Sequence, residues 1–188
     1  MLNPTDIDLQ NAYYNGWLSN TYVSAVIVWL MDGTAGWAQY NMPGSWHDSS
    51  ISGDGGLNDL LLDDDKTPPP FHIIADSAFP TSGRLGAKIM RSRKDNELRP
   101  DDAQENFAQV RMESALVSIR QGAEWGMRGL QACCTRLHKP LSFDPRKRQR
   151  LLKVCIMLFN FRTRTVGQNQ IRTVFDTRYE RKAHGINL

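Results

Sequence analysis

The chain has 188 residues, of which 40% are hydrophobic and 23% charged, and this composition is typical of a globular domain rather than of a fibrous or disordered protein. Its longest apolar run, residues 22–31, has ten residues, about half of what a membrane-spanning helix requires. We therefore expect a soluble chain without a membrane span or signal peptide. The three cysteines, two of them adjacent, cannot form a disulfide framework, which favours a reducing compartment and no structural zinc.

The charges are unevenly distributed, although the net charge is only +3. Residues 1–65 contain nine Asp and no Lys, Arg or Glu, whereas residues 143–188 contain 11 Lys or Arg and three acids. The acidic part is suited to binding cations and the basic part to binding phosphates. A solvated helix face explains the basic segment equally well.

A β-hairpin is the first predicted element. Residues 22–29 are β-branched, aromatic or small, and residues 36–40 resume an extended pattern after Asp32 and Gly33. Asp-Gly is a preferred hairpin turn because glycine accepts a positive φ. We therefore assign Asp32 to the turn and not to a functional site.

Residues 43–49 predict a turn that caps a helix near Ser49, and a short helix is expected through residues 57–62. The Asp triplet at 63–65 and the prolines at 68–70 predict a solvated loop. Residues 71–75 predict a buried strand that places Asp76 at its C-terminal end. The polar residues 84–111 are expected to form an exposed excursion that contacts a partner.

A long amphipathic helix is predicted over residues 113–137, because apolar residues recur there at intervals of three and four. Glu124 lies beside its apolar stripe. Arg120 and Arg128 stand four residues on either side, so a surface ion-pair ladder is an alternative to a functional role for Glu124.

The last helix is predicted to begin after Asp144 and Pro145 with a basic run and then to become apolar nearly all round over residues 151–161. Such a helix should pack on both sides. The final dozen residues are expected to be disordered.

Several motifs resemble those of the DDE superfamily endonucleases derived from PIF/Harbinger transposons, and the resemblance covers roughly residues 4–175. They are residues 14–18 (YNGWL), 43–49 (PGSWHDS), 74–80 (IADSAFP), 120–127 (RQGAEWGM), 160–164 (NFRTR) and 170–175 (QIRTVF).

The resemblance implies three carboxylates, Asp, Asp and Glu, which hold two divalent ions, Mg²⁺ or Mn²⁺, and cut DNA by in-line attack of a water or a 3′-hydroxyl. Such hard ions prefer oxygen ligands, and a pair of them activates the attacking oxygen and neutralises the leaving one. By motif, Asp76 matches the second acid and Glu124 the third. These two residues are 48 positions apart.

The first acid of the family lies upstream of the YNGWL motif, and the chain begins only a dozen residues before Tyr14, so the first strand and its Asp are expected to be missing. Asp6 or Asp8 could substitute only with a shifted register. Asp48 matches a recurrent family motif and is a second-tier metal ligand, although turn and cap duty explains it equally well. Losing one carboxylate should weaken metal binding and impair cleavage. Losing a strand predicts marginal stability or self-association.

The expected fold is α/β, a ribonuclease-H-like mixed sheet flanked by helices and lacking its first strand. Residues 1–175 would form the nuclease domain, and residues 176–188 a basic tail. The leading function is a metal-dependent DNA endonuclease or transposase domain. The alternative is a non-catalytic remnant that binds DNA or a protein. A plain RNA-binding module lacks the aromatic-basic pattern that it would need.

DNA is the expected partner, together with a separate DNA-reading protein, because no helix-turn-helix or similar reader is evident; no membrane partner is expected. The resemblance to eukaryotic transposases implies a nuclear location, which the basic run at residues 146–150 supports weakly.

Overall fold

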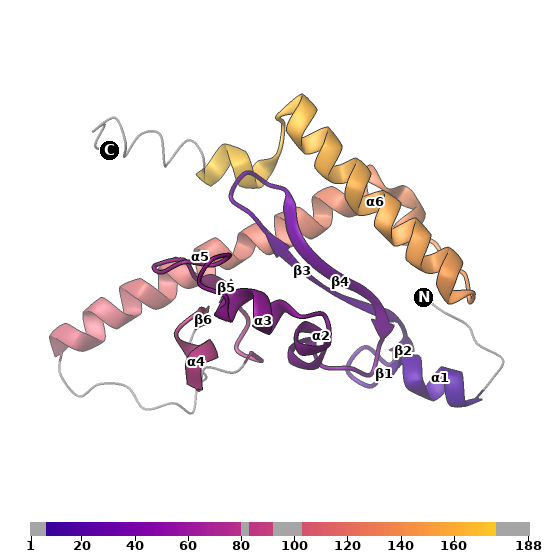
Figure 1. The fold of residues 1–188 in the computed structure, drawn as a ribbon, viewed down its shortest axis with the longest axis horizontal. Helices are drawn as coiled ribbons and strands as arrows, with labels where there is room; N and C mark the ends of the chain where they lie inside the picture. The colour runs from indigo at the N-terminus through magenta and orange to yellow at the C-terminus, as the bar shows by residue number, and fades with distance from the viewer. Residues whose placement is uncertain (1–6, 80–82, 92–102, 176–188) are drawn as a thin grey trace. The chain divides into compact units, whose positions relative to one another are not determined.

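The computed structural model describes residues 7–79, 83–91 and 103–175, with side chains from residue 107 onward in the last range. The backbone contacts divide the chain into two compact units, Met1–His47 with Ala123–Leu188, and Asp48–Gly122 (Figure 1). The predicted basic tail at 176–188 and the charged run at 92–102 lie outside the described residues. Helices and strands are both present, which confirms the α/β class.

A long β-hairpin forms in the first unit. Strand β3 (Val23–Trp29) pairs antiparallel with β4 (Ala35–Pro43). In the turn, Asp32 Oδ1 accepts hydrogen bonds from the Thr34 amide at 2.8 Å and the Thr34 hydroxyl at 2.7 Å. Gly33 has a φ of 83°, which a residue with a Cβ adopts only at a cost. The predicted hairpin and the turn role of Asp32 are confirmed.

A short hairpin precedes the long one. Helix α1 (Ile7–Tyr13) leads into β1 (Tyr14–Asn15), which pairs with β2 (Asn20–Thr21). Asn15 donates from Nδ2 to the Gly44 carbonyl at 3.0 Å and accepts at Oδ1 from the Leu18 amide at 3.1 Å. A Cβ at Gly44 would lie 2.5 Å from the Tyr13 carbonyl oxygen. A side-chain-to-backbone hydrogen bond therefore joins two of the family-like motifs.

Helix α6 (Pro145–Val166) packs on β4 with one face only. Its Phe159 makes an edge-on contact with Trp29 at 5.4 Å between ring centroids, and its Asn160 amide exchanges two hydrogen bonds with the backbone of Ala35, at 2.8 and 2.9 Å. The opposite face is exposed, so the prediction that this helix packs on both sides is wrong. Its apolar residues are too evenly distributed around the axis to reveal which face is covered.

Helix α5 (Ala103–Cys133) is followed by the 3-10 helix η1 (Thr135–His138). It begins ten residues before the predicted start, because its polar first turns are good helix formers but carry no apolar periodicity. At Gly126 a Cβ would lie 2.4 Å from the Trp29 ring, so glycine lets this helix approach β3 closely. Leu130 continues the same face into the cluster with Cys155 and Phe159.

The second unit has a small core of Ile51 from α2 (Asp48–Asp54) and Leu57 and Leu61 from α3 (Leu57–Leu62). Both helices were predicted from the sequence. Strand β5 (Ile73–Ala75) pairs in parallel with β6 (Ile89–Arg91) after a crossover that includes α4 (Gly83–Gly86).

The prediction that residues 84–111 form one exposed excursion is wrong, because this range contains β6 and the start of α5. Three-residue strands are too short to show a period. Lys88, which precedes β6, is buried and donates from Nζ to Asp64 Oδ1 at 2.9 Å and to the Thr67 carbonyl. This contact attaches the acidic loop to the sheet, so the loop is only partly the free solvated segment that was predicted.

Candidate functional site

Asp76 directly follows β5, as predicted, and its side chain is 58% exposed. Its Oδ1 accepts from Arg120 Nη1 on α5 at 3.2 Å and from the amide of Ser77. The Asp76 carbonyl accepts from the Phe79 amide at 3.1 Å, which closes the turn after the strand. The carboxylate is therefore accessible to water-borne ions, and one of its oxygens is engaged by a guanidinium.

Glu124 lies on α5 with its side chain exposed. Gly122 and Gly126, two residues to either side, are buried, so Glu124 is on the opposite face of the helix. Among the described residues, Arg120 forms its ion pair with Asp76, which does not support the alternative of a surface ladder between Arg120 and Glu124. Glu124 belongs to the first unit of the chain, and Asp76 to the second.

Asp48 is the first residue of α2 and is exposed. Its carbonyl accepts from the Ser52 hydroxyl at 2.7 Å, within the first turn of that helix. This position fits a role in stabilising the N-terminus of the helix, where the helix dipole favours a negative side chain. Its role as a metal ligand stays a prediction.

The carboxylates match a divalent metal in kind, since Mg²⁺ and Mn²⁺ take oxygen ligands and both Asp76 and Glu124 are reachable from solvent. However, the part of the chain that the structure describes contains no group of three or more His, Cys, Asp or Glu that could hold a metal ion. The described residues thus supply suitable ligands without an assembled three-ligand site.

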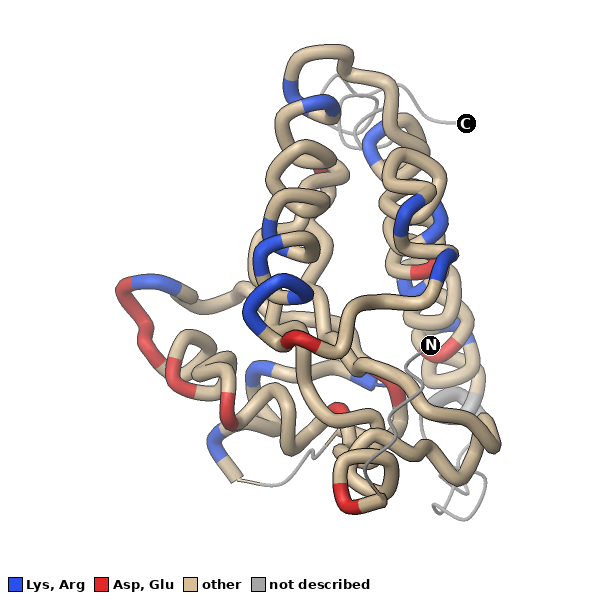
Figure 2. Tube along the Cα trace, turned by 90° about the vertical axis from the view of Figure 1, so that its right-hand side faces the viewer, with Lys and Arg blue, Asp and Glu red and all other residues tan. Residues whose placement is uncertain are grey.

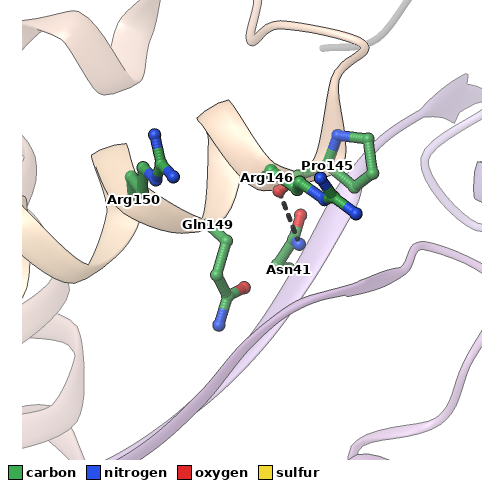
Figure 3. A pocket seen from close by; sticks show the side chains of 5 residues that line it. All are labelled: Asn41, Pro145, Arg146, Gln149 and Arg150. Carbon is green, nitrogen blue, oxygen red and sulfur yellow. Dashed lines mark hydrogen bonds between the residues drawn. The ribbon is translucent and has the colours of Figure 1, made fainter.

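A basic surface lies at the start of α6. Asp144 caps this helix by accepting from the amides of Arg146 at 2.9 Å and Lys147 at 3.3 Å. A shallow cavity of about 400 Å³ opens beside it (Figure 3), and its lining consists of Asn41, Pro145, Arg146, Gln149 and Arg150. Figure 2 shows Lys and Arg positions recurring along the long helices. The basic surface at the start of α6 belongs to the segment, residues 143–188, that was predicted to bind phosphates.

Arg148 differs from its neighbours in the basic run, because it is only 2% exposed. It donates to Asn41 Oδ1, to the Ser142 carbonyl at 3.1 Å and to the Tyr13 hydroxyl at 2.8 Å, and its guanidinium lies 5.0 Å from the centre of the Tyr13 ring. The side chain anchors α6 to β4 and to the end of α1, and it is unavailable to a phosphate. Its spacing of seven residues to buried Cys155 was the sequence signal for this role.

Two features of the site had no signal in the sequence. Arg120 and Asp76 are 44 residues apart, and no local pattern pairs them. Asn41 has a positive φ of 69° on β4 and contributes to both the cavity and the Arg148 anchor. Both pairings depend on tertiary structure.

Cys134 lies between η1 and α5, and burial, followed by its interaction with Cys155, raises the pKa of its thiol to about 12. Its Sγ lies 3.8 Å from the Cys155 carbonyl oxygen. Because reactive cysteines are thiolates, this thiol is inert at neutral pH and serves packing.

The sequence matches the DDE superfamily endonuclease family over residues 2–160, and the chain belongs to this family. No curated protein and no solved structure matches it significantly. None of the helices that the structure describes is both long and apolar enough to cross a membrane. Family membership makes this a nuclease- or transposase-type domain, whose substrate class is DNA and whose chemistry generally uses divalent metals.

Proposed function

We propose that the chain is the catalytic-type domain of a PIF/Harbinger-derived transposase, with a ribonuclease-H-like arrangement, and that it acts on DNA phosphodiester bonds in the nucleus. The observation that carries this proposal is the family match over residues 2–160 together with the order of the elements. Asp76 directly follows strand β5, and the long helix α5, which carries Glu124, comes later in the chain, in the order that the family resemblance implies.

Asp76 and Glu124 would hold the divalent ions, with Asp48 as a weaker candidate. When bound, such ions supply charge neutralisation at the phosphate and activation of the attacking oxygen. The chain's own residues set the conditions for binding. Asp76 is presented by the end of β5, and one of its oxygens is paired with Arg120. Arg120 would have to release Asp76 Oδ1 for that oxygen to help hold an ion.

The exposed cations at the start of α6, Arg146, Lys147 and Arg150, would contact DNA phosphates. Their contribution to DNA affinity would be electrostatic and independent of sequence, and it would fall steeply with salt. Recognition of a target sequence would belong to a separate DNA-reading protein.

A non-catalytic DNA- or protein-binding role is the second candidate. It is favoured by one observation, that the described residues contain no three-ligand metal group. In this case the basic surface would function while Asp76 and Glu124 would be surface acids.

A plasmid-nicking assay with Mg²⁺ or Mn²⁺ tests the proposal. The variants are Asp76→Asn and Glu124→Gln, and their matched controls are Asp59→Asn in α3 and Glu113→Gln in α5. We expect weak nicking, because the motifs supply only two of the three carboxylates, and we expect both site variants to abolish it and both controls to retain it. Nicking that survives in the site variants would contradict the assignment of these residues. DNA binding with no nicking under any metal condition would favour the second candidate.

A further inference from the structure

The exposed face of α6 carries a stripe of four large apolar side chains. Val154, Met157, Leu158 and Phe161 are 50%, 60%, 57% and 66% exposed. Their spacing of three, one and three residues puts them on one side of the helix, opposite the buried Cys155, Phe159 and Thr163. A soluble domain rarely leaves such a contiguous stripe uncovered, and stripes of this kind usually mark an interface.

Cations border this stripe on all sides. Arg150 lies before it, Lys153 and Arg162 lie along its flanks, and Arg164 lies just beyond it. All of α6, from residue 145 to residue 166, contains no Asp or Glu. The charges that α6 itself places around a bound partner are therefore all positive.

The charge pattern disfavours a second copy of the same face as the occupant. In an antiparallel pair centred between Met157 and Leu158, Lys153 of one copy would face Arg162 of the other. In a parallel pair each cation would face its own counterpart. Like charges across an interface cost binding energy, so self-association through this stripe is opposed.

Nucleic acid explains the cations but not the stripe, since phosphates gain nothing from four apolar side chains. An amphipathic helix explains both features. Its apolar residues at i, i+3, i+4 and i+7 would cover the stripe, and acidic residues on its flanks would lie opposite the cations.

We propose that the exposed face of α6 binds an acidic amphipathic helix of a partner protein. This inference goes beyond the proposed nuclease function and does not require it, because neither metal nor DNA cleavage takes part. Phe161 and Leu158 are the expected anchors, because they are large exposed side chains that a bound helix would bury, and a few well-packed side chains dominate the affinity of an interface.

The test uses the full chain and a fluorescein-labelled synthetic helix of about three heptads, with Leu at the apolar positions and Glu on both flanks. A peptide of identical composition in scrambled order is the control ligand. Fluorescence anisotropy without metal should show that the ordered peptide binds at least about tenfold more tightly than the scrambled one. The double variant Leu158→Ser with Phe161→Ser should weaken binding by at least about tenfold. Val117→Ser, an exposed apolar residue on α5, is the matched control and should change it by less than about twofold.

Three results would overturn the proposal. Equal binding of both peptides would show charge attraction alone. A dimer in sedimentation equilibrium that the double variant dissolves would assign the face to a second copy. Binding to phosphatidylserine vesicles but not to the ordered peptide, lost in the same variant, would assign it to a lipid surface. Circular dichroism of each variant verifies the fold, and because nicking is measured separately, failure here leaves the nuclease proposal untouched.

Discussion

Two arginines illustrate how differently the two units of the chain use the same side chain. Arg148 is 2% exposed and bonds to Asn41, Ser142 and Tyr13, whereas Arg120 is partly exposed and holds Asp76. A buried guanidinium with several partners stabilises the fold, because each acceptor is left without a hydrogen bond when the guanidinium is removed. A guanidinium on an exposed carboxylate can be replaced by another cation at little cost.

The largest expected effect is the loss of the buried anchor. Arg148→Ala leaves the acceptors on β4 and on the segment before α6 without a donor, and it should lower the free energy of unfolding by about 3 kcal/mol. Urea denaturation followed by circular dichroism measures this change. Arg150→Ala, on the exposed face of the same helix, should change it by less than about 0.5 kcal/mol. Equal effects of the two substitutions would show that Arg148 is not an anchor.

Close packing in the first unit gives the next largest effect. Gly126→Ala brings a methyl group to 2.4 Å from the Trp29 ring, and overpacking of this kind costs about 2 kcal/mol. Gly16→Ala is the matched control, because nothing lies within 4 Å of its added Cβ. Thermal unfolding should show a lower Tm for the first variant alone. An unchanged Tm would mean that α5 and β3 are not in contact at this point.

The exposed ion pair of Arg120 and Asp76 should contribute little to stability but should affect metal binding. Arg120→Gln removes an exposed ion pair, so we expect a change in stability below about 1 kcal/mol. The same substitution removes the cation that competes for Asp76, so Mn²⁺ should bind several-fold more tightly in calorimetric titration. Arg128→Gln, two turns further along α5, is the control and should leave Mn²⁺ affinity unchanged. Weaker Mn²⁺ binding in Arg120→Gln would contradict the view that arginine and metal compete.

The effect that is smallest at neutral pH, and that develops only at alkaline pH, concerns the Cys134 thiol. The pKa of Cys134 is raised from 9.0 to about 12, so the folded state keeps a proton that the unfolded state loses. The stability associated with this thiol is complete below pH 9 and declines as the pH rises from 9 towards 12. Urea midpoints across that range should fall less steeply in Cys134→Ala than in the wild type. Parallel curves for the two proteins would show that this thiol does not titrate with unfolding.

The elements that the sequence predicted correctly have local signals. Asp32 and Gly33 specify a turn, and Asp144 with Pro145 specifies the start of α6, so the hairpin and the last helix follow from a few neighbouring residues. Strand β6 has three residues and no periodicity, and the sequence analysis missed it. The pairing of Arg120 with Asp76 depends on tertiary structure and has no local signal.

Residue composition does not predict which face of α6 is covered. The apolar residues of α6 predicted burial on both sides, and the basic run at its start was interpreted as a phosphate-binding segment or a solvated helix face. The structure buries Arg148 and exposes Phe161 on the same helix. Residue type alone does not identify the covered face of a helix whose polar and apolar residues are mixed around its axis.

Calorimetric titration of Mn²⁺ into the full chain tests the central claim most directly, with Asp76→Asn and Glu124→Gln compared with Asp59→Asn and Glu113→Gln. The account predicts saturable binding that each site variant weakens by at least about tenfold and that the controls leave unchanged. Binding that is equal in all five proteins, or absent from a folded wild-type chain, would contradict the assignment of Asp76 and Glu124 as metal ligands.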